Sequence, residues 1–326
     1  MKRKSQWFAG LFLLAANALG AGDKRILLLP KLLPGQAIIY LVRFQSDKLV
    51  KTESAVVLPM APNAAQLDAH GLLRIEILDV QASESKSSIH ARARFLTRNS
   101  GVWVKKPGDK KPDWDIQRVD PDAKNVEFTI STDGSVNNVS GLDSLFPEQQ
   151  QAWRQWVARF ALAWTLPANG VKFGEKWKSK QSEQAGAPIA GLQWARDSMY
   201  VKNEPCQARQ LSISGDVTAA ADGPADTCAV LLTTSTLKQK SSSKDATPED
   251  FKLHELRTRG TARGTSEIIT YISLKTGLVV RATEETSQFM DVIVANADGS
   301  NGVRYNVDAK SHSEVLLVTE TLLTQP

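Results

Sequence analysis

The sequence predicts an α+β fold that is mostly antiparallel β-structure. We expect a curved sheet, or a half-barrel, with one long aromatic amphipathic helix packed on the concave face. Apolar and polar residues alternate along most of the chain, which is typical of strands with one face on a core and one in water. Residues 146–166 instead repeat apolar side chains at helical spacing. A lone helix with a large aromatic face needs a broad apolar partner, and a curved sheet supplies one.

The N-terminus has the three-part layout of a secretory signal peptide. Three basic residues precede the apolar run Trp7–Leu19, and small residues follow it. The run is too short to span a bilayer. We therefore expect residues 1–22 to be removed and residues 23–326 to form a single β-rich exported domain, periplasmic or secreted, with no transmembrane segment after cleavage. A retained N-terminal anchor is the alternative.

Two cysteines, Cys206 and Cys228, are the only ones in the chain. Neither lies near the expected cleavage site, so we do not expect a lipid-anchored protein. A cysteine pair in an exported chain predicts one structural disulfide. Two reactive thiols are the alternative, but the sequence contains no C-x-x-C motif.

The charge balance does not favour a nucleic-acid partner. Residues 1–22 contain three basic and no acidic residues, so their removal lowers the formal net charge from +5 to about +2. A protein that binds nucleic acid usually carries a strong basic footprint. We predict no nucleic-acid partner.

Hairpins are predicted before the helix, on the basis of alternation and turn residues. In order, the elements are a strand at Gln36–Ser46, its partner at Lys51–Leu58, a loop at Met60–Ala69, a strand pair at Leu72–Val80 and Ser87–Thr97, and a hairpin at Asn125–Asn137.

The helix itself has clear start and stop signals. Pro147 suits a first helical turn, where its missing N–H would be unpaired anyway, and Pro167 and Gly170 end the helix. One face carries Trp153, Trp156, Val157, Phe160 and Trp164. These five residues either line an apolar cavity beneath the helix or simply fill the core.

Strands resume after the helix. The expected elements are strands at Val171–Lys178, Leu192–Val201, Gln207–Ser214 and Cys228–Leu237, a mobile polar loop at Lys238–Asp250, a meander of strands at Phe251–Arg259, Ser266–Leu274, Gly277–Thr286 and Met290–Val294, and Val303–Val318 as two strands or one interrupted strand. The domain therefore divides into two half-sheets, 23–140 and 171–326, joined by the 146–166 helix.

No motif fixes a chemistry. The four histidines are not at metal-ligand spacing, and the sequence contains no HExxH, G-x-S-x-G, P-loop or dinucleotide-binding motif. We predict no catalytic residue, no metal and no cofactor. Paired carboxylates such as Asp113 and Asp115 would serve a glycosidase only if they faced each other across a cleft.

Several segments together resemble a loose group of uncharacterised bacterial exported proteins. They are GQAIIYLVRF, VEFTISTDGSVNNVSGL, the Trp-rich helix, Gly174-Glu175-Lys176-Trp177 and SEIITYISLKTGLVVRATEET. The build of that group is similar to the periplasmic lipoprotein-carrier and lipoprotein type. The resemblance implies a half-barrel that holds a lipid or acyl chain. Long insertions at 105–122 and 238–250 depart from it, and it carries no site residue over to this chain.

The leading hypothesis is a soluble exported protein that binds an apolar ligand, or a lipid or lipoprotein moiety, between the helix and the sheet. The first alternative is a structural or protein-interaction component of the cell envelope. The second alternative is an enzyme that acts on cell-wall polymer.

Overall fold

The structure is a computed structural model that describes residues 25–28, 31–54, 63–82, 87–105, 115–118, 125–131, 136–143, 153, 157, 166–167, 169–182, 187–211, 217–220 and 224–320. The predicted signal peptide, residues 1–22, lies outside these residues.

Within the described residues, a single sheet contains all the strands. They are β1 (Ala37–Ser54), β2 (Asn63–Ala82), β3 (Ser87–Lys105), β4 (Asp115–Arg118), β5 (Val126–Ser131), β6 (Val136–Ser140), β7 (Lys176–Ser182), β8 (Leu192–Cys206), β9 (Arg209–Leu211), β10 (Val217–Ala220), β11 (Asp226–Gln239), β12 (Leu256–Ser273), β13 (Val279–Asn296) and β14 (Val303–Glu320). The helix α2 (Glu249–Leu253) lies between β11 and β12.

The main path of the sheet runs β6-β5-β3-β2-β1-β14-β13-β12-β11-β8-β7. Neighbours along this path are antiparallel, and β9 pairs in parallel with the end of β14. The prediction of a mostly antiparallel β fold is confirmed. Strands from the two halves of the chain belong to one sheet, because β1 and β14 pair along their lengths.

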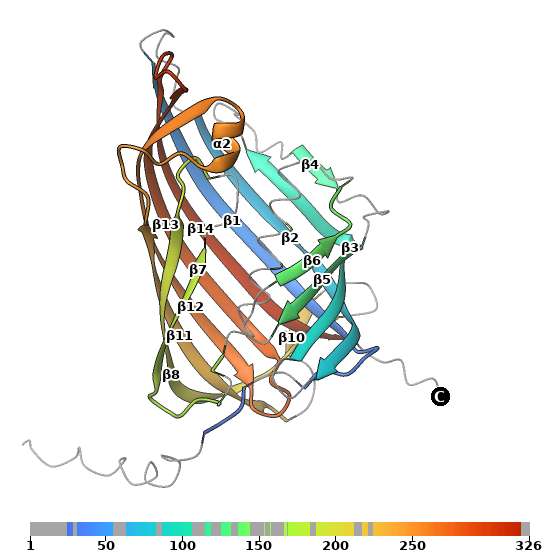
Figure 1. Cartoon of the computed structure of the whole chain (residues 1–326). Helices are drawn as coiled ribbons and strands as arrows, with labels where there is room; N and C mark the ends of the chain where they lie inside the picture. Colours follow the sequence, from blue (N-terminus) through green and yellow to red (C-terminus); the bar gives the residue numbers. More distant parts are fainter. Residues whose placement is uncertain are drawn as a thin grey trace, which may run out of the picture.

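The two ends of the strand order lie on the same side of the central strands. Figure 1 shows β5 and β6 at one end, and β7 and β8 at the other, in front of the long strands β1, β2, β13 and β14. We call the face that looks toward this side the inner face. Among the described residues, no pairing joins β6 to β7, so the sheet is open.

Three hydrophobic clusters make up the core of the inner face. The first lies on β1, β2, β3 and β5 and includes Trp153 and Val157, both in helical conformation. The second lies on β8, β11 and β12 with Leu28 and Val171. The third lies on β8, β11 and β13 near the segment that carries α2. A fourth, smaller cluster of Ile39, Leu72 and Val318 lies on the opposite face of β1, β2 and β14, where Leu211 of β9 and Val217 of β10 pack against it.

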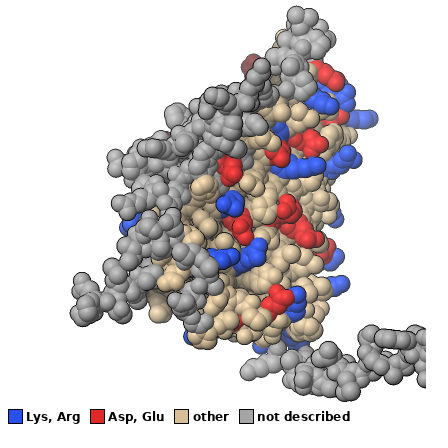
Figure 2. All heavy atoms as spheres, turned by 180° about the vertical axis from the view of Figure 1, so that it is seen from behind, with Lys and Arg blue, Asp and Glu red and all other residues tan. Residues whose placement is uncertain are grey.

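The opposite, outer face carries charges of both signs. Figure 2 shows Lys and Arg interleaved with Asp and Glu across this face. Arg304 donates to both carboxylate oxygens of Asp291 on β13, at 2.8 and 2.6 Å, and these hydrogen bonds lower the pKa of Asp291. Cross-strand pairs of opposite charge stabilise a sheet modestly and keep this face in water.

The N-terminal strands are longer than the sequence predicts. Residues 37–54 form one strand, so Lys51–Leu58 is not a hairpin partner of Gln36–Ser46. The predicted loop Met60–Ala69 is also wrong, because its residues from Asn63 onward belong to β2. The polar stretch at Asp47-Lys48 resembles a turn, but β2 and β14 supply backbone partners to both sides of β1 there.

The C-terminal strands correct the prediction in the same way. Each of β12, β13 and β14 is 18 residues long. The short predicted strands Ser266–Leu274, Gly277–Thr286 and Met290–Val294 are parts of β12 and β13, and Val303–Val318 is one uninterrupted strand. Polar residues on both faces interrupt the apolar pattern of these strands, but backbone pairing with the neighbouring strands continues through them.

The segment between β11 and β12 is packed and hydrogen-bonded, which corrects the mobile loop predicted at Lys238–Asp250. Ala246 is fully buried, and its N–H donates to the carbonyl of Thr258 at 3.0 Å. The hydroxyl of Ser241 donates to the carbonyl of Ala190 at 2.6 Å. The predicted strand Phe251–Arg259 begins instead as α2, after Pro248 at the N-cap position.

We expect Thr247→Val to lower the free energy of unfolding by about 2 kcal/mol. The Thr247 hydroxyl accepts from the buried N–H of Thr258 at 3.0 Å and lies 2.8 Å from Oδ1 of Asp245. Valine would leave the Thr258 N–H buried without an acceptor. Urea denaturation measures the loss, and Thr247→Ser, which keeps the hydroxyl, is the matched control. Equal losses in the two variants would contradict this role for the hydroxyl.

Candidate ligand cavity

A cavity of about 140 Å³ opens on the inner face of the sheet. Its wall includes residues of β2 and β7 and of the strands that lie between them in the sheet, which are β1, β14, β13, β12, β11 and β8. Its described lining consists of Tyr40, Val42, Leu73, Leu166, Trp177, Ser179, Arg196, Ser198, Leu231, Thr233, Ile268, Thr270, Ile272, Val279, Ala282, Thr283, Glu284, Ser313 and Val315.

Strand register brings one row of these side chains together across the sheet. Alternate residues of a strand point to the same face, so residues paired across neighbouring strands share that face. The row runs, pair by pair, through Trp177, Ser198, Thr233, Ile268, Glu284 and Ser313. The cavity wall is therefore built by pairing between strands that are distant in sequence.

One part of the wall is apolar. Tyr40, Leu231 and Ile272 are buried, and Val279 and Leu166 lie beside them with little exposure. Burial of the Tyr40 ring raises the pKa of its hydroxyl, because a phenolate would lose its hydration there. The Tyr40 side chain therefore stays neutral, and this part of the wall offers a contact surface without charge.

A second part of the wall is polar, and we call it the polar band. Its members in the wall are Arg196, Ser198, Thr233, Glu284 and Ser313. We include in the band three polar residues that continue it on the same strands outside the lining, Ser235, Ser266 and Thr286. The four serines of the band are buried, although hydroxyl side chains are mostly exposed in proteins. The band lies next to the apolar wall along the same strands.

Hydrogen bonds connect members of the band. The hydroxyls of Ser198 and Thr233 lie 2.8 Å apart. Oε1 of Glu284 accepts from the hydroxyls of Ser266 at 2.9 Å and Thr286 at 3.2 Å. These bonds hold the Glu284 carboxylate in place on β13.

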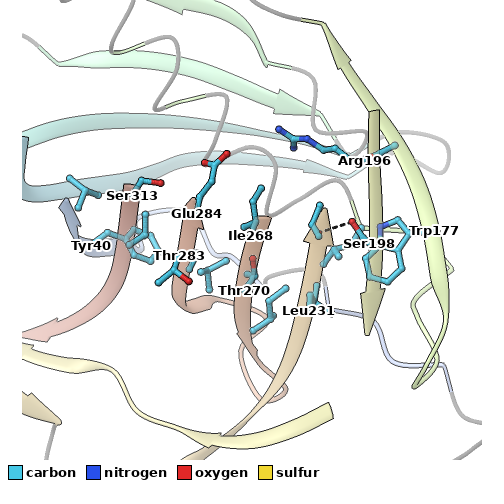
Figure 3. A pocket seen from close by; sticks show the side chains of 18 of the residues that line it. Tyr40, Trp177, Arg196, Ser198, Leu231, Ile268, Thr270, Thr283, Glu284 and Ser313 are labelled. Carbon is cyan, nitrogen blue, oxygen red and sulfur yellow. Dashed lines mark hydrogen bonds between the residues drawn. The ribbon is translucent and has the colours of Figure 1, made fainter. Parts of the chain in front are cut away.

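Two charged side chains stand on the same side of the cavity. Figure 3 shows the guanidinium of Arg196 extending from β8 toward the side on which the Glu284 carboxylate stands, with Ser198 on the same strand and Trp177 on the neighbouring strand β7. Both Arg196 and Glu284 are half-buried. The cavity therefore has an apolar wall at one side and opposite charges with hydroxyls at the other, which is an arrangement that suits an amphipathic molecule.

Metal chemistry finds no support in the part of the chain that the structure describes. Within it, no group of three or more His, Cys, Asp or Glu side chains is placed to hold a metal ion. The described lining contains one acidic side chain, Glu284, and no histidine or cysteine.

The structure places two of the five side chains that the sequence singled out. Trp153 and Val157 are buried in the first cluster, where the Trp153 ring lies 5.0 Å from the ring of Phe95. Neither is among the described residues that line the cavity. The other three, Trp156, Phe160 and Trp164, lie outside the described residues, so their assignment as ligand-binding residues stays a prediction.

Sequence reasoning missed most of the cavity wall. The signal was present as the alternation of Ser266, Ile268, Thr270 and Ile272 on β12. The other face of the same strand carries Ile269 and Tyr271, so the local pattern does not distinguish the inner from the outer side. Only the pairing with β11 and β13 makes that distinction.

The predicted disulfide between Cys206 and Cys228 is present. It links the end of β8 to the start of β11, and Cys228 is fully buried. A structural disulfide is typical of proteins that fold in an oxidising compartment, so the bond fits an exported protein. Within the described part of the chain, no helix has the length and apolar character needed to cross a membrane.

Comparison with known proteins assigns no family. No family model and no curated protein matches the sequence. Among solved structures, the chain is similar to a lipoprotein candidate from Parabacteroides distasonis, at 10% identity and a TM-score of 0.28, over 90% of this chain and 98% of that chain. It is also similar to an exported-protein candidate with a YmcC-like fold from Bacteroides fragilis, at 9% identity and a TM-score of 0.23, over 88% and 97% of the two chains. Scores this low carry no function to the present chain.

Proposed function

We propose that this protein is an exported binding protein for an amphipathic ligand, such as a lipid or the acyl moiety of a lipoprotein. The ligand lies on the concave side of a half-barrel formed by the sheet, below the 146–166 helix. The observation that carries the proposal is the two-part wall of the cavity. An acyl chain fits against Tyr40, Leu231 and Ile272, while a polar head group reaches the polar band.

Burial of hydrocarbon supplies the driving force. Each methylene transferred from water to an apolar site contributes about 0.8 kcal/mol, so six methylenes contribute about 5 kcal/mol. Association and ordering of the chain offset a large part of this gain. Hydrogen bonds from the head group to the hydroxyls of Ser198 and Thr233 then set its orientation rather than the bulk of the affinity.

Leu166 connects the helix predicted at 146–166 with the cavity. This residue ends the predicted helix at 146–166, is buried, and lines the cavity beside Leu231 and Ile272. Trp153 and Val157, in helical conformation, pack against the inner-face cluster on β1 and β2. These contacts support a helix that runs over the inner face with its C-terminal end at the cavity.

The test uses one variant that fills the cavity and one that does not. Ala282 lines the cavity on β13, and Ser287 is exposed on the outer face of the same strand. We expect Ala282→Phe to weaken binding of a fluorescent fatty acid at least about tenfold, because the ring occupies space that the acyl chain needs. Ser287→Phe adds the same side chain on the outer face and should bind like the unchanged protein.

Organic extraction of the protein purified after export, followed by mass spectrometry, identifies any ligand carried from the cell. The proposal fails if extraction yields no lipid and the unchanged protein does not bind the fatty acid. Equal binding by the two phenylalanine variants would place the ligand elsewhere. The alternatives, a structural or protein-interaction role in the envelope and an enzyme on cell-wall polymer, would then take precedence.

A further inference from the structure

A short segment crosses one end of the sheet, and we call it the strap. It comprises residues 25–28 and 31–36. Ile26 exchanges backbone hydrogen bonds with Val171 at 2.8 and 2.9 Å, and the N–H of Lys31 donates to the carbonyl of Thr276 at 3.1 Å. The strap ends beside β2, where the N–H of Gly35 donates to the carbonyl of Ile77 at 2.7 Å. In Figure 1 its dark blue trace runs along the end of the sheet opposite α2.

The strap has a buried side and an exposed side. Leu28 and Leu32 are buried in the core clusters of the inner face. Leu27 and Leu33 point the other way and are 65% and 70% exposed. Phe173, two residues after the Val171 that pairs with the strap, is 59% exposed. Three of the four exposed large apolar side chains in the described part of the chain therefore lie at this end.

Basic residues lie close to these apolar ones along the chain. Lys31 and Lys275 are exposed, and the backbone hydrogen bond from Lys31 to Thr276 brings their positions in the chain close to each other. Lys172 and Lys176 flank Phe173 in sequence. We call Leu27, Lys31, Leu33, Lys172, Phe173, Lys176 and Lys275 the basic apolar end.

The nearest carboxylate in this segment is already engaged. Glu175 accepts from the backbone N–H of Lys172 at 2.7 Å and from the guanidinium of Arg25 at 2.7 Å. Both hydrogen bonds lower the pKa of the Glu175 carboxyl, and the one from the Lys172 backbone has the larger effect. Asp226 is a second carboxylate at this end, where it accepts from the Ser273 hydroxyl beside Lys275. Five basic side chains, Arg25, Lys31, Lys172, Lys176 and Lys275, therefore stand against two acidic ones, Glu175 and Asp226.

We propose that the basic apolar end docks on the surface of an anionic lipid bilayer. Exposed leucine and phenylalanine side chains enter the headgroup boundary, and lysines beside them bind the anionic headgroups. A protein partner or a second copy of the chain would also cover the apolar side chains. However, lysine is depleted in protein–protein interfaces, whereas it favours an anionic lipid surface.

Docking at this end would place the cavity next to the membrane. Leu28, on the buried side of the strap, belongs to the same cluster as Leu166, Leu231 and Ile272, which line the cavity. The docking proposal does not depend on what the cavity binds, because the exposed side chains and the lysines lie outside it.

The test is sedimentation of the protein, purified after export, with vesicles of two compositions. One set contains phosphatidylcholine alone, and the other contains phosphatidylglycerol and phosphatidylcholine. One variant carries Leu27→Asn and Leu33→Asn, and a second carries Lys31→Glu and Lys275→Glu. The control is Leu253→Asn, because Leu253 is 83% exposed but lies on α2 at the opposite end. Circular dichroism verifies that each variant is folded.

We expect strong binding to the vesicles that contain phosphatidylglycerol and not to those of phosphatidylcholine alone. Added salt should weaken this binding, because it screens the lysines from the anionic headgroups. Each lysine near an anionic surface strengthens binding about fivefold, so the lysine variant should bind at least about 25-fold more weakly. The leucine variant should lose binding about tenfold or more, and Leu253→Asn should not change it. Equal binding to both vesicle sets, no binding, or an equal loss in Leu253→Asn would overturn the proposal. A dimer in size-exclusion chromatography that the leucine variant dissociates would assign the surface to self-association instead.

Discussion

Replacement of Gly260 by alanine is expected to lower the free energy of unfolding by more than about 3 kcal/mol. Gly260 has a φ of +151°, a conformation that residues with a side chain rarely adopt. It lies opposite Val292 on β13, and a Cβ atom there would lie 2.1 Å from the carbonyl oxygen of Asp291. That oxygen belongs to the backbone, so β12 and β13 would have to separate.

Gly260 occupies this conformation because β12 changes its partner there. Its N–H donates to the carbonyl of Ser243 at 2.9 Å, and its own carbonyl accepts from the side-chain amide of Gln239 at 3.1 Å. Strand β11 ends at Gln239, and the packed segment that follows replaces it along the edge of β12. The backbone must turn toward this segment while it stays close to β13.

Gly299→Ala is the matched control. Gly299 has a φ of +86°, and an added Cβ would meet nothing within 4 Å. This variant should lose only about 1 kcal/mol, from the left-handed backbone alone. Thermal and urea unfolding of both variants measure the difference. Similar small losses would contradict the close approach of the two strands at Gly260.

The second large effect concerns the disulfide. Replacement of both Cys206 and Cys228 by serine should lower the free energy of unfolding by about 3 kcal/mol in the chain-entropy view, for a loop of 22 residues. Buried Cys228 precedes Ala229, which belongs to the cluster that contributes Leu231 and Ile272 to the cavity wall. The loss should therefore also loosen β11 near the cavity.

Urea unfolding with and without a reductant separates the bond from the side chains. Reduction should destabilise the unchanged protein by about as much as the double serine substitution does. It should have no effect on the double variant. A reduced protein that unfolds at the same urea concentration as the oxidised one would show that the bond is not needed for stability.

Local patterns in the sequence predict the presence of strands far better than their lengths. Alternation identifies Leu72–Val80 and Ser87–Thr97 as a pair, and the structure confirms this pairing. The same reasoning fails at Asp47-Lys48, where polar residues resemble a turn inside an 18-residue strand. A strand with partners on both sides keeps its backbone bonds regardless of side-chain polarity, and a local window of sequence does not contain those partners.

In the candidate site, too, local patterns predict single elements but not which residues meet across the sheet. The Trp-rich stretch draws attention because aromatic residues at helical spacing are easy to recognise, yet Trp153 and Val157 lie in a packed cluster. The wall of the cavity comes from ordinary strand residues such as Thr270, Ala282 and Ser313. Their meeting depends on the register of the five strand pairings that join β7 to β14, which no single segment encodes. The cysteine pair, in contrast, follows from residue type and compartment alone.

The pairing of β1 with β14 has a consequence for how the chain reaches its native state. Strand β1 lies near the start of the described chain and β14 at its end, yet they are neighbours along 16 positions, from Ile39 with Val318 to Ser54 with Val303.

In a chain threaded through a membrane from its N-terminus, β1 emerges long before its partner. Until synthesis and translocation finish, one edge of β1 and one edge of β13 remain unpaired, and unpaired edges invite pairing with other chains. Pairing between distant segments is also slow. Truncation within β14 should therefore destabilise the protein more than the distance of the C-terminus from the cavity suggests, because it leaves the edges of both β1 and β13 unpaired.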